Sequence, residues 1–314
     1  MTVDLLTLGE TMVSARTDSL LRLGGTLSLS IAGAESNVAT AMARLGHRTR
    51  WVGRVGDDEF GALVVRTLRA ESVDVAHVVT VADRLTGMLL LERAPAGRTR
   101  VHYRRRSSAA TTLEPGDVDA ALRAGARLLH VTGITPALGD SPARTVRHAL
   151  ETAHTADVTT CLDVNFRRKL WSRDDAGRAL RPLIPWVDIL VASEDELPLV
   201  ADGLDDAGRA GVLLSSGVRE VVVKRGAAGA TVYAADCERS EPALSVPVVD
   251  TVGAGDAFTA GYLSGLLDGL ALADRLGRAV GLGAAAVTAV GDWEGLPTRA
   301  ELDQIGHTTD EALR

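Results

Sequence analysis

Apolar residues along this chain gather in short runs that alternate with helical patterns. Runs typical of buried strands lie at 3–8 and near 127–132, 158–164, 187–192 and 220–224. Helical spacing of apolar residues lies near 115–124, 141–154, 174–181, 194–202 and 206–215. Because strands and helices follow one another in turn, the pattern predicts a mostly parallel central sheet that is sandwiched by helices.

Further elements are expected outside this regular stretch. A strand is predicted at 50–55, and Gly56-Asp57-Asp58 is expected to cap the helix after it. Another helix is predicted after residue 37, with Gly46 as its end. Three more helices are expected from residues 254, 270 and 298, and a small hairpin from 229–235 and 244–249.

Two segments interrupt the alternation. Residues 11–31 are short and irregular in pattern, except that Leu27, Leu29 and Ile31 alternate with serines as in a half-exposed strand. The extended runs 86–93 and 99–103 are separated by Pro95-Ala96-Gly97, which predicts a hairpin. We expect one α/β domain over residues 1–314, with a small β-sheet lid formed by insertions at about 11–34 and 85–112.

Composition places the chain among ordinary globular proteins. Hydrophobic residues make up 46% and charged residues 24%, and the net charge of −7 argues against non-specific nucleic-acid binding. Cys161 and Cys237 have no metal-type spacing, the N-terminus lacks the basic start of a signal peptide, and no apolar run could span a bilayer. We therefore expect a cytoplasmic protein that binds neither membrane nor nucleic acid.

Residues 250–258, Asp-Thr-Val-Gly-Ala-Gly-Asp-Ala-Phe, hold the most specific chemistry in the sequence. Gly253 and Gly255 permit a tight turn, and helical spacing begins at Ala254, so free N–H groups and the helix dipole form a seat for an anion. Asp256 within that seat suits a base that takes a proton from a hydroxyl attacking a phosphate. The local pattern alone fits equally well an ordinary capped helix with an acid in its first turn.

These nine residues also resemble the C-terminal signature of the ribokinase-like, or PfkB, family of carbohydrate kinases. The resemblance implies that Asp256 is the catalytic base. It also implies that the backbone of Gly253, Ala254 and Gly255 receives the transferring phosphate.

The stretch Gly33-Ala34-Glu35-Ser36-Asn37 forms a predicted strand-to-helix turn. Taken alone, Ser36 or Asn37 serves more simply as a helix cap than as a ligand to sugar hydroxyls. The run resembles the N-terminal signature of the same kinases, and its Gly-Ala-Glu-x-Asn form is similar to the branch that phosphorylates 2-keto-3-deoxygluconate. The resemblance implies substrate contacts from Gly33, Ala34, Glu35 and Asn37.

Two basic stretches are similar to the same branch. One runs from Tyr103 through three arginines, and the other, from Asp163 to Trp171, follows a predicted strand. Guanidinium groups suit carboxylates and phosphates, although charge runs are more often solvated loops. The resemblance implies that Tyr103 and Arg105 bind an acid sugar and that Arg167 helps to hold the substrate or the phosphoryl group. It also implies that Asn165 lies at the nucleotide.

The nucleotide side of the site is less specific. Glu196 and Lys224-Arg225-Gly226 follow predicted strands, and residues 281–288 are expected to wall the adenine. By resemblance, Lys224 and Gly226 contact ATP together with Asn165, Gly253 and Gly255. Glu196 is expected in the outer shell of a Mg²⁺ ion held mainly by ATP, although Ser193 replaces the usual Asn of its motif.

Three alternatives to an acid-sugar kinase remain at this point. The first is a kinase for fructose, ribose or a nucleoside. Met88 favours it, because a tyrosine is expected near this position in the acid-sugar branch. A sugar- or nucleotide-binding regulator would have no use for Asp256 as a base. A dinucleotide-dependent dehydrogenase would need a Gly-x-Gly-x-x-Gly turn, and no such turn follows the first strand.

An exposed edge strand of the lid could pair with a second copy to give a homo-oligomer.

Overall fold

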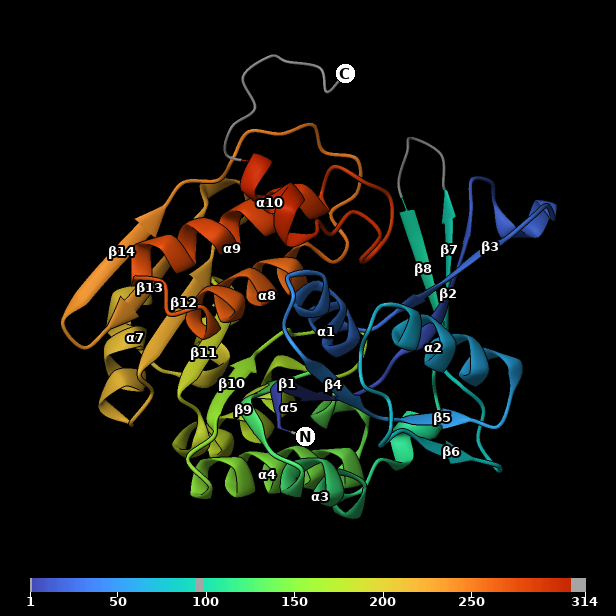
Figure 1. The fold of residues 1–314 in the computed structure, drawn as a ribbon, viewed down its shortest axis with the longest axis horizontal. Helices are drawn as coiled ribbons and strands as arrows, with labels where there is room; N and C mark the ends of the chain where they lie inside the picture. The colour runs from blue at the N-terminus through green and yellow to red at the C-terminus, as the bar shows by residue number, and fades with distance from the viewer. Residues whose placement is uncertain (1, 94–98, 306–314) are drawn as a thin grey trace.

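The central element is an eight-stranded sheet in a computed structural model that describes residues 2–93 and 99–305 (Figure 1). Its strands in chain order are β1 (Val3–Leu8), β4 (Thr49–Val52), β9 (Ala126–Thr132), β10 (Thr159–Asp163), β11 (Ile189–Ser193), β12 (Glu220–Lys224), β13 (Ala230–Ala234) and β14 (Cys237–Glu241). Across the sheet the order is β14-β13-β12-β11-β10-β9-β1-β4. Every pair from β4 to β12 is parallel, and the two pairs at the β14 edge are antiparallel. The predicted mostly parallel sheet is confirmed.

Helices cover both faces of this sheet (Figure 1). One face packs against α1 (Ala34–Arg44), α8 (Ala254–Leu267) and α9 (Leu272–Ala286). The other face packs against α3 (Pro115–Arg123), α4 (Asp140–Thr155), α5 (Arg173–Leu180), α6 (Leu197–Val200) and α7 (Asp206–Ser215). Successive strand residues serve opposite faces, so that Leu5 joins the cluster of α1 and α8 while Leu6 joins that of α3 and α4.

A separate four-stranded sheet lies beside the central one (Figure 1). It contains β2 (Met12–Thr17), β3 (Ser28–Ala32), β7 (Met88–Arg93) and β8 (Thr99–Arg104), in the order β3-β2-β7-β8. The predicted pairing of the runs 86–93 and 99–103 is confirmed, whereas the turn Pro95–Gly97 lies outside the described residues. The strands come from the two segments assigned to a lid, and movement of this sheet over a substrate stays a prediction.

Two predicted elements differ from the structure in the first hundred residues. The strand at 50–55 is interrupted at Gly53 and becomes β4 and β5 (Arg54–Gly56), and the Trp51 ring lies so near that a Cβ at Gly53 would be 2.3 Å from it. Residues 12–17 are not irregular but form the buried strand β2. Its mixture of small and polar residues conceals the strand pattern.

The second hairpin and the helix at 194–202 are also wrong in part. β13 pairs with Cys237–Glu241 through a two-residue turn, and 244–249 has no regular structure. The helix at 194–202 is reduced to α6, because Pro198 lacks an N–H and is accommodated only in a first helical turn.

The remaining elements complete the fold around the small sheet and the end of the chain. They are β6 (Val79–Val81), α2 (Glu59–Ala70) and α10 (Arg299–Ile305), with β6 pairing in parallel with β5. The predicted cap of α2 is confirmed, since the Asp58 carboxylate accepts a hydrogen bond from the Gly61 N–H at 2.7 Å. Within residues 2–93 and 99–305, no helix has the length and apolar character needed to cross a membrane.

Candidate active site

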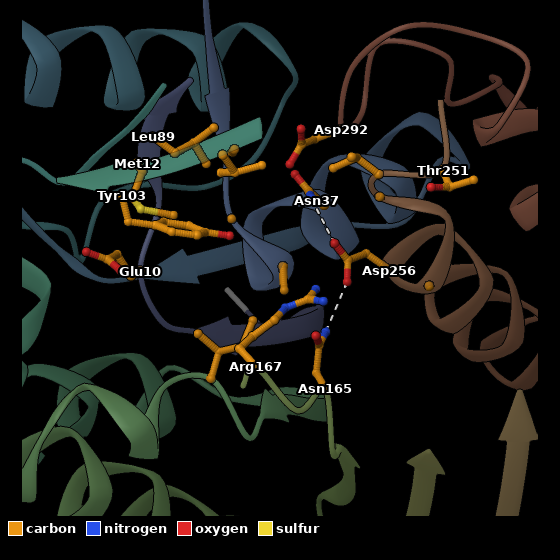
Figure 2. A pocket seen from close by; sticks show the side chains of 18 of the residues that line it. Glu10, Met12, Asn37, Leu89, Tyr103, Asn165, Arg167, Thr251, Asp256 and Asp292 are labelled. Atoms are coloured by element: carbon orange, nitrogen blue, oxygen red, sulfur yellow. Dashed lines mark hydrogen bonds between the residues drawn. The ribbon is translucent and has the colours of Figure 1, made fainter. Parts of the chain in front are cut away.

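Asp256 lies in the first turn of α8 and is only 5% exposed. Two amides hold its carboxylate: Asn37 Nδ2 donates to Oδ2 at 2.8 Å and Asn165 Nδ2 donates to Oδ1 at 3.2 Å (Figure 2). Burial raises the pKa of Asp256, although Arg167 and the Asn37 amide act to lower it. A carboxylate whose pKa is raised binds a proton more strongly, which suits a general base.

The amide of Asn37 serves Asp256 and does not cap a helix. α1 begins at Ala34, earlier than expected, and its N-cap is Gly33, with no side-chain hydrogen bond to the first turn. The simpler interpretation of Ser36 and Asn37 as caps is therefore wrong. Asn37 instead binds Asp256, which lies 219 positions away in sequence.

The turn that begins α8 requires glycine. Gly253 has a φ of 77°, and a Cβ there would lie 1.9 Å from the Asp292 carbonyl oxygen, so a larger residue would displace the backbone. The first N–H groups of a helix have no partner within it, and here Gly253 and Gly255 line the same pocket as Asp256. The predicted anion seat therefore has the backbone that it needs.

Lys224 provides a fixed positive charge behind this seat. Its Nζ donates to both oxygens of Asp163, at 2.8 and 2.9 Å, and the Thr259 hydroxyl donates to the same carboxylate at 2.8 Å. Burial acts to lower the pKa of Lys224, but the carboxylates of Asp163, Glu196 and Asp256 together outweigh it, and the pKa is raised overall. The ammonium therefore stays charged, and it lies 3.6 Å from where a Cβ on Gly255 would be.

A hollow of about 410 Å³ brings most of the predicted site residues together. It opens beside the carboxyl ends of the central strands, where ligands bind in open α/β sheets, and the small sheet forms its other wall (Figure 2). Its lining includes Gly33, Ala34, Asn37, Tyr103, Arg105, Asn165, Arg167, Glu196, Lys224, Gly253, Gly255 and Asp256.

Arg105 lines the pocket from the position directly after β8, and it forms an ion pair with Glu10. Glu10 lies in the loop after β1, is 2% exposed, and also accepts a hydrogen bond from the Ser108 hydroxyl at 2.6 Å. The Arg105 guanidinium carbon lies 5.6 Å from the centre of the Tyr103 ring. Glu10 was not predicted as a site residue, although its position at the end of a central strand is a signal for one.

Arg167 is an exposed cation that points into the pocket towards Asp256 (Figure 2). Within the described residues its side chain makes no hydrogen bond or ion pair. Its positive charge acts to lower the pKa of Asp256, so the two side chains interact electrostatically. Arg167 is therefore free to bind an anionic group beside the candidate base.

Glu35 is the one predicted substrate residue that the structure places away from the pocket. It has no exposed surface, and its Oε1 accepts hydrogen bonds from the hydroxyls of Thr132 and Thr135, both at 2.7 Å. Burial raises the pKa of Glu35 to about 7. This side chain supports the backbone below the pocket, and the geometry gives no support to a direct substrate contact.

The residues predicted on the nucleotide side differ in where they lie relative to the pocket. Both carboxylate oxygens of Glu196 accept backbone N–H groups, from Phe166 at 2.7 Å and from Ser193 at 2.8 Å, so Glu196 joins the loops after β10 and β11. Gly226 has a φ of 52° and does not line the pocket. Among residues 2–93 and 99–305, no group of three or more His, Cys, Asp or Glu side chains could hold a metal ion.

Asp292 is a pocket residue that sequence reasoning missed. It follows α9 in an irregular loop, and its side chain points towards Asn37 (Figure 2). Burial, with Asp256 and Glu294 nearby, raises the pKa of Asp292 to about 7. No periodic pattern marked it, because its place in the site depends on how the loop folds back over α8.

A family model described as pfkB family carbohydrate kinase matches residues 3–299. The chain belongs to the PfkB family of carbohydrate kinases. Its enzymes are phosphotransferases that act on sugar hydroxyls, so the alternatives of a dehydrogenase and of a regulator without turnover are set aside.

Relatives within the PfkB family act on different sugars. A 2-dehydro-3-deoxygluconokinase from Bacillus subtilis (strain 168) is 37% identical, covering 96% of this chain and 95% of the relative. A fructokinase from Escherichia coli is 35% identical, covering 94% and 97%. The solved structure of a fructokinase from Vibrio cholerae O395, with fructose, ADP and calcium bound, is 26% identical, with a TM-score of 0.83 and coverage of 96% and 99%. Family membership therefore leaves the sugar open.

Proposed function

We propose that this protein transfers the γ-phosphoryl group of ATP to the 6-hydroxyl of 2-keto-3-deoxygluconate. The observation that carries the proposal is the shared pocket of Asp256, Arg167, Arg105 and Tyr103. A base for the hydroxyl and cations for a carboxylate then face one ligand-sized space. The similarity to the Bacillus subtilis 2-dehydro-3-deoxygluconokinase agrees with this choice.

Asp256 acts as the general base in this proposal. The sugar hydroxyl attacks the γ-phosphorus, its proton passes to the Asp256 carboxylate, and ADP leaves. The amides of Asn37 and Asn165 keep the carboxylate oriented, while each of its oxygens retains a lone pair for the proton. Burial favours the protonated product of this step, since it raises the pKa of Asp256.

The N-terminus of α8 stabilises the charge that develops on the transferring group. The backbone at Gly253, Ala254 and Gly255 presents the N–H groups of a helix start, and the Lys224 ammonium, paired with Asp163, lies close by. We assign nucleotide binding to Lys224, Asn165 and the glycines of this turn.

The residues present fit Mg²⁺ only as an ion held chiefly by the nucleotide. Mg²⁺ commonly binds through phosphates and water with few protein ligands, and no described cluster offers a cage. When bound, the ion would neutralise phosphate charge. Glu196 fixes the loops on which Asn165 and Arg167 lie, which is consistent with an indirect role.

An acid sugar would place its carboxylate among the cations of the opposite wall. Arg167 has no anionic partner among the described residues, whereas Arg105 is already paired with Glu10. We infer that Arg167 supplies most of the attraction for the negative charge. Arg105, held in place by Glu10 and close to the Tyr103 ring, supplies directed N–H groups.

A neutral sugar is the second candidate, and a specific observation favours it. Glu10 neutralises Arg105, and the small-sheet wall presents Met12, Leu89 and Leu91 rather than further polar groups. Such a wall suits a ligand without a charge at that end. The fructokinase similarity is consistent with this alternative.

A coupled ADP-release assay separates the two. Purified protein receives Mg·ATP with 2-keto-3-deoxygluconate, gluconate, fructose, ribose or adenosine, and kcat/KM is compared across the panel. We expect the keto-deoxy acid to exceed fructose by at least about tenfold, the effect of one charge-assisted hydrogen bond. A higher kcat/KM for fructose would overturn the substrate proposal while leaving the role of Asp256 intact.

A further inference from the structure

A second hollow, of about 780 Å³, adjoins the sugar pocket on the side away from the nucleotide residues. The two hollows share part of a wall, formed by Val101, Tyr103, Arg105 and Arg167. The second one continues past this wall between the end of β8 and the loop after β10. We call it the basic groove.

Positive charge dominates the basic groove. Its lining contains Arg105, Arg106, Arg167, Arg168 and Lys169, and no Asp or Glu of residues 2–93 and 99–305 lines it. The whole chain carries a net charge of −7, so this concentration of cations is local. Arg106 and Arg168 are exposed and make no ion pair or side-chain hydrogen bond within the described residues.

The wall of the groove is held in place before any ligand arrives. Lys169 Nζ donates to the Val101 carbonyl at 2.8 Å and lies 5.3 Å from the centre of the Tyr103 ring. Arg105, whose side chain is only 10% exposed, lies at the same ring, and its Nε is buried without an acceptor. These contacts join the small sheet to the loop after β10 and give the cations a fixed frame.

We propose that the basic groove is a second anion site that binds a phosphate monoester dianion. Guanidinium groups bind phosphate oxygens in pairs, and Arg106 and Arg168 line the groove from two separate segments, after β8 and after β10. The volume is larger than that of the sugar pocket, so an esterified sugar or polyol fits as well as its phosphate. The groove contains none of the residues assigned to phosphoryl transfer, and it shares only its common wall with the sugar pocket.

An anion in the groove weakens binding of an acid sugar next door. Arg105 and Arg167 line both hollows, and an arginine drawn towards the groove offers less attraction to a carboxylate in the sugar pocket. This site goes beyond the proposed function. Only the effect on the acid sugar rests on that function.

Binding is tested first without sugar or nucleotide. Glycerol 3-phosphate is titrated calorimetrically into the full-length protein at constant ionic strength. We expect saturable binding that the double variant Arg106→Gln/Arg168→Gln weakens at least tenfold, whereas Arg66→Gln, an exposed arginine on α2, leaves it unchanged. No saturable binding, or equal binding by the double variant, would overturn the site.

Inorganic phosphate in a parallel titration identifies the source of the ligand. Equal affinity for phosphate and glycerol 3-phosphate supports a site for free phosphate. Preference for the ester supports a phosphorylated metabolite. Binding of both that Mg·ADP abolishes but the double variant retains would place the anion in the nucleotide site and reject the groove.

The coupling is measured through initial rates. Glycerol 3-phosphate should raise the apparent KM for 2-keto-3-deoxygluconate several-fold, with kcat changed less than twofold, and the double variant should lose this response while keeping its basal rate. An unchanged KM at saturating glycerol 3-phosphate would reject the coupling. A protein that binds the ester but does not phosphorylate the acid sugar would refute the proposed function alone.

Discussion

At the α8 end of the pocket the Asp256 carboxylate is hydrogen-bonded by two neutral amides, whereas at the small-sheet end a carboxylate and a guanidinium form an ion pair. Asp256 accepts hydrogen bonds from the amides of Asn37 and Asn165. Glu10 pairs with Arg105 and accepts a bond from Ser108. The first arrangement leaves a basic oxygen for chemistry, and the second uses its charge to hold an arginine in position.

We interpret this difference as a division between the reaction that all family members share and the choice of sugar, which varies between them. The α8 end is built on the helices and loops of the central sheet, and in the proposed function it carries out the phosphoryl transfer. The small-sheet end is built on the segments after β8 and after β1, and in the proposed function it contacts the part of the sugar that varies between substrates. Changes at the first end should abolish turnover, and changes at the second should alter preference.

The largest effect is expected from Asp256→Asn. Loss of the base should lower kcat by at least about 10³-fold, within the range that general bases contribute, while Mg·ADP binding measured by calorimetry stays within a few-fold. Asp274→Asn is a matched control, since Asp274 is an exposed acid in the first turn of α9. A loss of less than tenfold would show that the α8 end does not depend on this carboxylate.

Arg167→Met should produce the next largest effect, and it should depend on the sugar. Removing the unpaired cation should lower kcat/KM for 2-keto-3-deoxygluconate by about 10- to 10²-fold, because a charge-assisted contact contributes about 1.5–3 kcal/mol. The loss for fructose should be at least tenfold smaller. Equal losses for both sugars would assign Arg167 to the transferring phosphate instead, and the contrast between the two ends would fail.

Sequence patterns predicted the α8 end more completely than the small-sheet end. The glycine turn and Asp256 are contiguous in sequence, and the strand–helix alternation placed Lys224 and Asn165 at strand ends. Glu10 and Asp292 could not be paired with their neighbours in this way, because their partners lie in segments that only the tertiary fold brings close. The sequence also did not indicate that the Glu35 carboxyl is buried. It fits beside Gly9, where a Cβ would lie 2.3 Å from the carboxyl carbon, and this contact depends on the tertiary fold.

Two buried carboxyls near the pocket differ in their partners: Glu35 accepts hydrogen bonds from hydroxyls, whereas Glu10 pairs with a cation. Glu35→Gln tests what burial without a cation does to the pH dependence of stability. The pKa of Glu35 is raised by burial from 4.5 to about 7, so the folded state binds the proton more tightly than the unfolded state. Its contribution to stability is therefore present below pH 4.5 and lost as the pH rises through about 7.

The loss expected from Glu35 is about 3 kcal/mol at most, from 1.36 kcal/mol per pKa unit. Urea unfolding between pH 4.5 and 8 should show a shallower decline for Glu35→Gln than for the natural protein. Gln keeps an oxygen for Thr132 and Thr135, so the comparison at pH 4.5 controls for lost hydrogen bonds. Identical pH slopes would mean that Glu35 is ionised in the folded protein.

The smallest effect is expected where the two ends are joined. Arg16 of β2 donates to Asp250 Oδ2 at 2.9 Å, and Asp250 Oδ1 accepts the Val252 N–H in the loop that leads into α8. Both side chains are partly exposed, so the pair is worth about 0.5–1 kcal/mol. Arg16→Met should therefore raise KM for the sugar about two- to fivefold without changing kcat, whereas Arg22→Met, an exposed arginine of the same sheet region, should change neither. A fall in kcat equal to the rise in KM would show that the small sheet also positions the α8 turn, and the two ends would then act as one unit.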